Sequence, residues 1–441
     1  MLAASRRLDN TDLYRQNPNM RRINLASALL AITASQCLAA DTMPKFSDLP
    51  ESKELPHPLV MLDGRPVKDA ATWENQRRPE VVRLFEHYMF GRAPGAPQNI
   101  KFKIDREEKN YFGGKATLKE VSIKFGPEAA PPIHLLLITP NTGKPAPIFL
   151  GLNFQGNHTT LADPKVHLTK TWVRNGKDNL ADESQRGDSA SRWPFEQAIA
   201  RGYAIATFYQ GDIDPDKKDD WTDGIHPHYY KNGQTEPGAN EWGCIAAWAW
   251  GLSRAADYLA QDPNIDSKRI CVMGHSRNGK TALLAGALDP RFALTVSNQS
   301  GCGGAALSRR RVGETVAVIN KNFPHWFCDE FAKFGDNEDK LPLDQHLLIS
   351  LIAPRPALVC SATGDKWADP EGEFAACVAA SPVYELLGKA AIGSKQYPQE
   401  NHLIDSIVGY HVRPGKHNVG EPDWKVFMDF ADKHLGLPAS E

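Results

Sequence analysis

A surplus of charge of one sign is missing from this 441-residue sequence, in which 51 lysines and arginines stand against 53 aspartates and glutamates. The formal net charge of -2 argues against nucleic acid as the main partner, since nucleic-acid binding favours a strongly basic surface. Beyond the first forty residues, no segment approaches the roughly 20 apolar residues that a membrane-spanning helix needs. The sequence also lacks internal repeats and long linkers. We therefore expect a globular protein without a membrane span.

Cysteine is scarce, with seven in the chain, and no two of them form a CxxC pair. One lies in the N-terminal leader discussed below, and the remaining six are Cys244, Cys271, Cys302, Cys328, Cys360 and Cys377. An exported protein could pair them in about fifteen ways. Several lie in apolar runs, where a buried free thiol is as good an interpretation. We do not predict a disulfide.

The N-terminus resembles an export signal. From Met20, two arginines precede a short apolar stretch and then the small residues Ala39 and Ala40, a pattern typical of a secretory signal peptide. Residues 1–19 form an upstream extension on this interpretation, and a plain disordered terminus is the alternative. We expect a periplasmic or secreted protein with one catalytic domain at residues 41–441, acting as a monomer.

The body of the chain has the pattern of an α/β protein. The segment 72–94 has helical spacing and ends at glycine and proline. Short runs rich in branched residues predict strands at 120–125, 133–140, 146–154, 203–209, 269–273, 293–298 and 357–362. Helical patterns such as 244–261 separate the later strands, which predicts a mostly parallel sheet covered on both faces, with an antiparallel edge formed by the first strands.

The stretch "GHSRNGK", residues 274–280, follows one of these strands and opens a helix. A strand, a tight turn and a helix make Ser276 a candidate nucleophile, held above the sheet as in the GxSxG elbow. Asn278 stands where that motif has its second glycine, and Gly279 comes one position late. An ordinary serine N-cap is the alternative.

Two cations follow the serine. Arg277 and Lys280 lie on one face at the start of a helix, where the macrodipole disfavours each cation by roughly 0.3–1 kcal/mol. A negative charge on the substrate would offset this cost. We expect Arg277 to help bind an oxyanion and Lys280 to hold a substrate carboxylate, with a second oxyanion donor in residues 155–159. A surface lysine paired with a nearby acid is the alternative.

The base is expected beyond the last strand. His417 lies in a glycine-flanked loop directly before the last helical pattern and is our choice, with His411 and His402 as alternatives. A loop histidine is more often simply solvated, so its position carries the choice.

The acid that orients the histidine is expected just after the strand at 357–362. Asp365 comes first and is our choice, with Asp369 and Glu373 as alternatives. Acidic loops are commonly solvated turns, so this choice also depends on position.

These segments resemble the bacterial glucuronoyl esterases, which belong to carbohydrate esterase family 15. The resemblance covers nearly the whole chain after the leader and includes "RPEVVRLFEHYMFGRAP", "GLNFQGNHT", "GHSRNGKTALLAGALDPRFALTVSNQSGCGGAALSRRRVGE", "LPLDQHLLISLIAPRP" and "DKWADPEGEF". It implies an α/β-hydrolase fold, a three-layer sandwich. The implied activity is a serine esterase that cleaves esters between (4-O-methyl-)glucuronic acid of xylan and lignin alcohols.

By position, the resemblance implies Ser276 as nucleophile, His417 as base, Arg277 in the oxyanion hole and Lys280 on the uronate. It also implies that Glu314 and Trp367 bind the sugar. Some family members carry a glutamate as the acid where this chain has Gln299, which cannot ionise. The role of the acid therefore falls to Asp365.

Other functions are weighed against this one. A general carboxylesterase or acetyl-xylan esterase is the second hypothesis, and a hydrolase-like carbohydrate binder without turnover is the third. No metal or other cofactor is expected, because His226 and His228 lack further ligands and are predicted to lie in a solvated loop. Trp326 and Phe154 are candidates to pack on sugar faces, although a core position is commoner for such residues. The arginines at 309–311 are interpreted as structural pairs or as pocket walls.

Overall fold

The structure is a computed structural model that describes residues 43–126, 128–174, 176–218, 220–231 and 233–436. These described residues belong to one compact unit. The predicted extension and signal peptide at residues 1–40 lie outside the described residues. In the described part of the chain, no helix has both the length and the apolar character to cross a bilayer.

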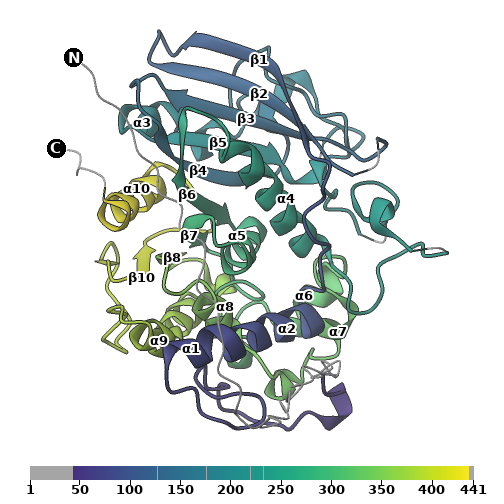
Figure 1. The fold of residues 1–441 in the computed structure, drawn as a ribbon, viewed down its shortest axis with the longest axis vertical. Coiled ribbons are helices and arrows are strands. Elements are labelled where there is room, and N and C mark those ends of the chain that lie inside the picture. Colours follow the sequence, from purple (N-terminus) through teal and green to yellow (C-terminus); the bar gives the residue numbers. More distant parts are fainter. Residues whose placement is uncertain (1–42, 127, 175, 219, 232, 437–441) are drawn as a thin grey trace, which may run out of the picture. The chain divides into compact units, whose positions relative to one another are not determined.

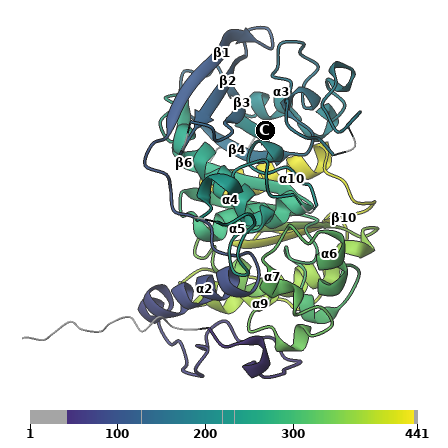
Figure 2. The ribbon, with the colours of Figure 1, turned by 90° about the vertical axis from the view of Figure 1, so that its right-hand side faces the viewer.

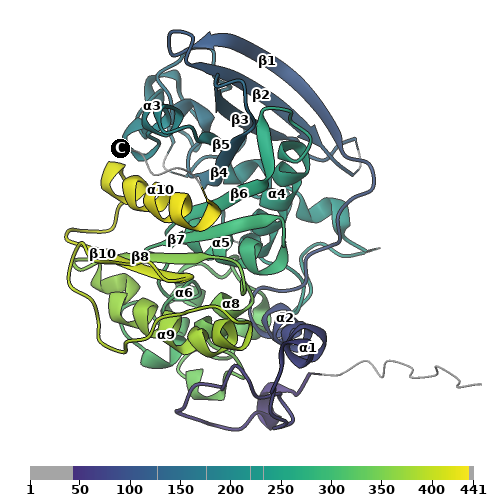
Figure 3. The same cartoon turned by 60° about the vertical axis from the view of Figure 1, so that its left-hand side comes forward.

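A single ten-stranded sheet runs through the described residues, in the order β1-β2-β3-β5-β4-β6-β7-β8-β10-β9 (Figure 3). Neighbouring strands from β5 to β10 run parallel, whereas β1, β2 and β3 form an antiparallel edge and β9 an antiparallel end. The bounds are β1 Lys101–Tyr111, β2 Ala116–Lys124, β3 Ile133–Pro140, β4 Ala146–Asn153, β5 Ala204–Tyr209, β6 Ile265–His275, β7 Phe292–Asn298, β8 Ala357–Ala362, β9 Leu403–Ile404 and β10 Val408–Arg413. The seven predicted strands and the antiparallel edge are confirmed, and β1, β9 and β10 were not predicted.

Helices cover both faces of the sheet. They are α1 Ala70–Thr72, α2 Arg78–Tyr88, α3 Phe195–Ala200, α4 Cys244–Leu259, α5 Arg277–Leu288, α6 Val316–Asn322, α7 Asp329–Ala332, α8 Gln345–Ser350, α9 Pro370–Leu386 and α10 Glu421–Leu435. Figure 1 shows α10 and α3 to one side of the strands and α4 and α5 to the other, and Figure 2 brings α4 and α5 to the front. The predicted helix at 72–94 is a run from α1 through a π-helical turn, Trp73–Arg77, into α2.

Two apolar cores separate these layers. Side chains alternate across a strand, so Ile270 and Val272 of β6 join the core beneath α4 and α5, whereas Cys271 and Met273 join the core beneath α3 and α10. Burial on both faces explains why the central strands read as continuous apolar runs. Parallel strands end at the same edge of a sheet, so polar loops meet at the carboxyl ends of β4, β6, β7, β8 and β10.

Candidate active site

The turn from β6 into α5 holds Ser276 in a strained conformation. Its backbone has φ 59° and ψ -128°, and its N–H donates to the carbonyl of Asn298 at 2.9 Å. Such angles are costly for a residue other than glycine and persist where the surrounding structure imposes them. They raise the serine above the end of the sheet, in the position of a nucleophile elbow.

The glycines of this turn are required by space. A Cβ on Gly274 would lie 1.8 Å from the Asn278 carbonyl oxygen, and one on Gly279 would lie 3.0 Å from the Ser300 Cβ. Asn278 itself is buried and its Nδ2 donates to the Leu152 carbonyl at 3.2 Å, which ties the turn to β4. The asparagine in place of a second motif glycine is thus an anchor of the elbow.

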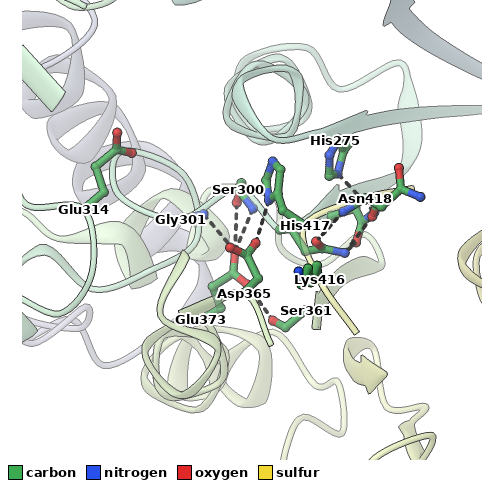
Figure 4. A network of polar contacts seen from close by, with 12 residues as sticks. His275, Ser300, Gly301, Glu314, Ser361, Asp365, Glu373, Lys416, His417 and Asn418 are labelled. Carbon is green, nitrogen blue, oxygen red and sulfur yellow. Dashed lines mark hydrogen bonds and ion pairs between the residues drawn. The ribbon is translucent and has the colours of Figure 1, made fainter. Parts of the chain in front are cut away.

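Asp365 and His417 meet because their loops leave two adjacent strands. Ala362 at the end of β8 lies in register with Arg413 at the end of β10, and the Gly364 N–H donates to the Gly415 carbonyl at 2.8 Å. The loops then bring Asp365 Oδ2 within 2.6 Å of His417 Nδ1 (Figure 4). The carboxylate fixes Nδ1 as the donor, so Nε2 is left for proton exchange.

The side chains of Asp365 and His417 differ in their exposure to solvent. The Asp365 side chain is 5% exposed, whereas that of His417 is 43% exposed. A buried acid beneath an open imidazole orients the ring while a substrate can still reach it. The alternative bases do not join this arrangement: His411 is buried within β10, and His402 precedes β9.

Glu373, an alternative acid, lies beneath the loop after β7. One carboxylate oxygen accepts from the backbone N–H groups of Ser300 and Gly301 at 2.8 and 3.0 Å, and the other from the Ser361 hydroxyl at 2.5 Å. Burial raises the pKa of Glu373 to about 7, against the lowering effect of these hydrogen bonds. Figure 4 shows Glu373 beside Asp365, so it supports the site from below.

Asp369, the other alternative acid, has a structural role. It caps the start of α9 by accepting from the Gly372 N–H at 3.1 Å, and it pairs with Arg310 at 2.7 Å. The two arginines next to Arg310 are paired as well, Arg309 with Asp344 and Arg311 with Glu338. The three arginines are structural pairs, as one of the two interpretations held.

His275 is a site residue that the sequence reasoning missed. Its ring centroid lies 4.4 Å from that of His417, and its Nδ1 lies 3.4 Å from Asn298 Nδ2. Burial holds the pKa of His275 well below its usual range, so the ring is neutral. The uncharged ring lies against His417 at an interplanar angle of 41°. The position directly before Ser276 is the signal that could have revealed it.

Arg277 is held by a buried carboxylate. Its Nε lies 3.2 Å from Asp216 Oδ2, and its guanidinium carbon lies 5.0 and 5.3 Å from the ring centroids of Phe154 and Trp326. Asp216 also accepts from His325 Nε2 and Trp326 Nε1, both at 2.8 Å.

The pKa of Asp216 falls to about 2, because the hydrogen bond from His325 and the positive charge of Arg277 outweigh the opposing effect of burial. Asp216 was missed because the acidic run 212–220 resembles a solvated loop. Its place after β5, at the carboxyl end of a parallel strand, is the signal that could have found it.

The aromatic candidates separate into two kinds. Trp326 is 4% exposed and stacks on Phe323 at 3.8 Å with an interplanar angle of 4°, so it belongs to the core. Phe154 is half-buried between the guanidinium groups of Arg277 and Arg192. The ring of Trp326 therefore has no free face for a sugar, whereas Phe154 stays a candidate for such a contact. Trp367, by contrast, is 55% exposed.

Lys280 is buried one helical turn after Ser276. Its ammonium donates to the carbonyls of Ser300 at 2.5 Å and Cys302 at 2.6 Å, and lies 3.8 Å from Glu314 Oε2. The Glu314 N–H in turn donates to the Trp367 carbonyl at 3.0 Å. The structure therefore brings the three predicted sugar-binding residues together in one chain of contacts.

Three further expectations concern a metal site, the loop at His226 and the cysteines. No group of three or more His, Cys, Asp or Glu side chains that could hold a metal occurs among the described residues. The predicted solvated loop at His226 is wrong: the side chain is buried, with Nδ1 2.5 Å from Asp214 and Nε2 3.0 Å from the Trp242 carbonyl. All six cysteines of the described residues are buried and unpaired.

A strained serine between strand and helix, a histidine bound to a buried aspartate, and a cation beside the serine are features of an ester hydrolase. Comparisons with known proteins agree with that class. A family model described as "Glucuronyl esterase, fungi" matches residues 193–388. Carbohydrate esterase MZ0003, from an unknown prokaryotic organism, is 53% identical over 388 residues, which cover 86% of this chain and 89% of that protein.

Two further relatives are named as glucuronoyl esterases. The solved structure of a glucuronoyl esterase from Solibacter usitatus has 44% identity and a TM-score of 0.84, covering 88% of this chain and 100% of that one. A 4-O-methyl-glucuronoyl methylesterase of Phanerochaete chrysosporium is 29% identical, over 81% of this chain and 66% of that protein. The chain belongs to the glucuronoyl esterase family, carbohydrate esterase family 15, and is an ester hydrolase.

Proposed function

We propose that this enzyme hydrolyses the ester between (4-O-methyl-)glucuronic acid of xylan and lignin alcohols, through an acyl-enzyme on Ser276. The observation that carries the proposal is the Lys280–Glu314 pair at 3.8 Å, one helical turn from the strained serine. A general esterase has no need of a buried cation at that place. The names of the relatives, glucuronoyl esterase and 4-O-methyl-glucuronoyl methylesterase, support the same substrate class.

The proposed reaction has two steps. His417 Nε2 accepts the proton of the Ser276 hydroxyl as its oxygen attacks the ester carbonyl, and the same proton passes to the alcohol that leaves. Water then attacks the acyl-enzyme with His417 again as base, which releases the uronic acid and restores the serine. Asp365 keeps Nδ1 protonated and stabilises the imidazolium during both steps.

The negative charge that develops on the carbonyl oxygen needs donors already in place. The backbone N–H of Arg277 follows the serine directly and is the first donor proposed. The Arg277 guanidinium, fixed by Asp216 and by two rings, supplies positive charge beside it. The loop after β4 provides the proposed second donor, since β4 pairs with β6 and both strands end at the same edge.

The uronate ring is proposed to lie over Lys280, Glu314 and Trp367. An ammonium has three donors, and two of those on Lys280 are directed to backbone carbonyls, so one remains for Glu314 or a sugar oxygen. The exposed Trp367 indole offers a flat apolar face to a sugar. Together they would place the ester carbon at Ser276.

We infer an α/β-hydrolase fold of three layers, a single catalytic domain at residues 41–441, and a monomeric protein exported to the periplasm or medium. The sheet with an antiparallel edge and helices on both faces supports the fold. The leader pattern in the sequence supports export.

The test is release of glucuronic acid from benzyl glucuronate, measured beside hydrolysis of an acetyl ester of xylan. We expect rapid cleavage of the uronate ester, little acetyl release, and no activity of Ser276→Ala on either. A preference for the acetyl ester would favour a general or acetyl-xylan esterase. Turnover of neither substrate by a folded protein would favour a carbohydrate binder.

A further inference from the structure

Gln299 lies directly after β7 and makes a two-way contact with the backbone of the residue that follows His417. Its Nε2 donates to the Asn418 carbonyl at 2.8 Å, and its Oε1 accepts from the Asn418 N–H at 3.0 Å. The side chain is buried, and its backbone has φ 51°, a left-handed conformation that a glutamine seldom adopts. The strain at this residue is held by a further bond, from its own N–H to the Cys360 carbonyl at 2.7 Å.

This contact bears on the catalytic loop because it fixes Asn418, the residue next to His417, and Asn298 and Arg192 also contact Asn418, at 3.4 and 3.1 Å. The His417 ring is 43% exposed, so solvent rather than packed side chains covers one part of it. Asp365 fixes one ring nitrogen, and the neutral His275 ring packs beside it at 4.4 Å. The backbone of the loop is fixed next to His417, by Gln299 and by Arg413, whose Nη2 donates to the Asn418 carbonyl at 2.7 Å.

We propose that Gln299 is a positioning residue for His417, and that it must be neutral because it donates to and accepts from the same backbone unit. The proposal rests on the role proposed above for His417. An ionised carboxylate has acceptors only, so at this position one of its oxygens would face the Asn418 carbonyl without a proton between them. The family resemblance suggests the opposite, namely that a glutamate here would serve as an acid.

A protonated glutamic acid, in contrast, reproduces the glutamine pattern, since its O–H donates and its C=O accepts. The Gln299→Glu variant should therefore keep the contact with Asn418 only while its new carboxyl group is protonated. The titratable and charged groups around this position are His275, His417, Asp365, Glu373, Arg413, its partner Asp423, and Arg192, which donates to the Asn418 side chain at 3.1 Å. The carboxylates of Asp365 and Glu373 and the burial favour the protonated form of the new side chain. Arg413 opposes it, but its Nε is engaged with Asp423 at 2.8 Å.

The experiment measures kcat and KM on benzyl glucuronate between about pH 5 and pH 8, for the wild type, Gln299→Glu and Gln299→Met. The wild-type profile is the reference, with no loss of kcat expected as pH rises. Gln299→Glu should instead lose kcat with rising pH as the new carboxyl ionises. Gln299→Met, which loses both hydrogen bonds, should lower kcat roughly 100-fold at all pH values with little change in KM, since small misplacements of a catalytic group have such effects.

Gln345→Met is the matched control, because Gln345 is also a buried glutamine with a backbone contact, to the Gly304 carbonyl at 2.6 Å. It should lower the melting temperature without moving kcat. Should Gln299→Glu fail to fold, the kcat of Gln299→Met against this control decides the matter. Wild-type kcat in Gln299→Met would overturn the proposal.

The opposite hypothesis, that a glutamate at position 299 serves as a second acid, predicts different kinetics. If a glutamate at 299 acts as an acid, Gln299→Glu should keep its activity as pH rises and should restore activity to Asp365→Asn. Either result would overturn our proposal. Ser276→Ala separates this failure from a failure of the proposed function. Full activity in that variant would show that Ser276 is not the nucleophile, and His417 would then lose its proposed role as well.

Discussion

The two cations at the start of α5 lie one turn apart but are held in different ways. Arg277 faces a carboxylate at 3.2 Å and two aromatic rings, and its side chain is 19% exposed. Lys280 is 5% exposed and donates to two backbone carbonyls, with its nearest carboxylate at 3.8 Å.

The charge of Arg277 is thus balanced by a specific anion, whereas that of Lys280 is met mainly by dipoles. The difference indicates two tasks. A cation balanced and fixed in direction suits the transient charge of a transition state, which is the same for every ester. A cation with weaker compensation suits a persistent polar or anionic group on one kind of substrate. The predictions below test this division.

Removing the serine should abolish the chemistry that both cations serve. Ser276→Ala is expected to lower kcat about 10⁴- to 10⁶-fold on uronate and acetyl esters alike. The fold should remain, because the hydroxyl makes no contact on which the elbow depends and the backbone bond to Asn298 is kept. Initial rates with a circular-dichroism melt as the control give the measurement. Residual activity near that of the wild type would rule out this serine.

Arg277→Met should lower kcat about 10²- to 10³-fold, by removing positive charge beside the oxyanion. The loss is expected to be equal on the uronate ester and on an acetyl ester, since both develop the same charge. Arg277→Lys keeps the charge without the planar contacts and should recover part of the rate. A loss confined to the uronate ester would assign Arg277 to substrate binding and would erase the contrast with Lys280.

Lys280→Met should raise KM for benzyl glucuronate roughly 10- to 100-fold, the range of one hydrogen bond to a charged group. Its acetyl-ester kinetics should stay close to those of the wild type. Glu314→Gln keeps the shape of the side chain and should give a smaller shift in the same direction. An equal loss on both esters would show that the lysine acts on the oxyanion region or on the fold.

Asp216→Asn should have the smallest effect on rate, a few-fold fall in kcat, because Arg277 keeps its aromatic contacts. Its clearer effect is expected on the free energy of unfolding at acid pH. The folded-state pKa of Asp216 is about 2, below its unfolded value near 4, so ionised Asp216 stabilises the wild type above that range. This contribution is lost as pH falls from about 4 toward 2, and the variant should lack it. Urea unfolding across that range is the measurement, and equal slopes with pH would contradict the prediction.

Much of the fold could be predicted from the sequence because buried parallel strands are apolar on both faces. β1 escaped prediction because its residues, Lys101–Tyr111, alternate charged and half-buried side chains at an exposed edge. β10 escaped prediction because Gly409, His411 and Arg413 interrupt its short apolar pattern. Both strands lie toward an end of the sheet, β1 at one edge and β10 beside the two-residue strand β9 at the other.

Within the site, chain order led to Asp365 and His417, and the structure brings them into contact at 2.6 Å. Their catalytic roles stay proposals. His275 and Asp216 were not predicted to belong to the site, and Gln299 was noted only as a residue that cannot ionise, because each contacts a partner far along the chain. A local pattern cannot reveal which backbone carbonyl a buried amide will meet, since strand register decides it.

The six unpaired thiols of the described residues can report local opening of the structure. Cys271 and Cys360 lie in the central strands β6 and β8, whereas Cys302 lies in the loop whose carbonyl binds Lys280. A thiol-reactive dye can label each of them only when its surroundings open. Labelling rates resolved by mass spectrometry would therefore rank the active-site loop against the sheet, with Cys302 expected to react first and to be slowed by bound uronic acid.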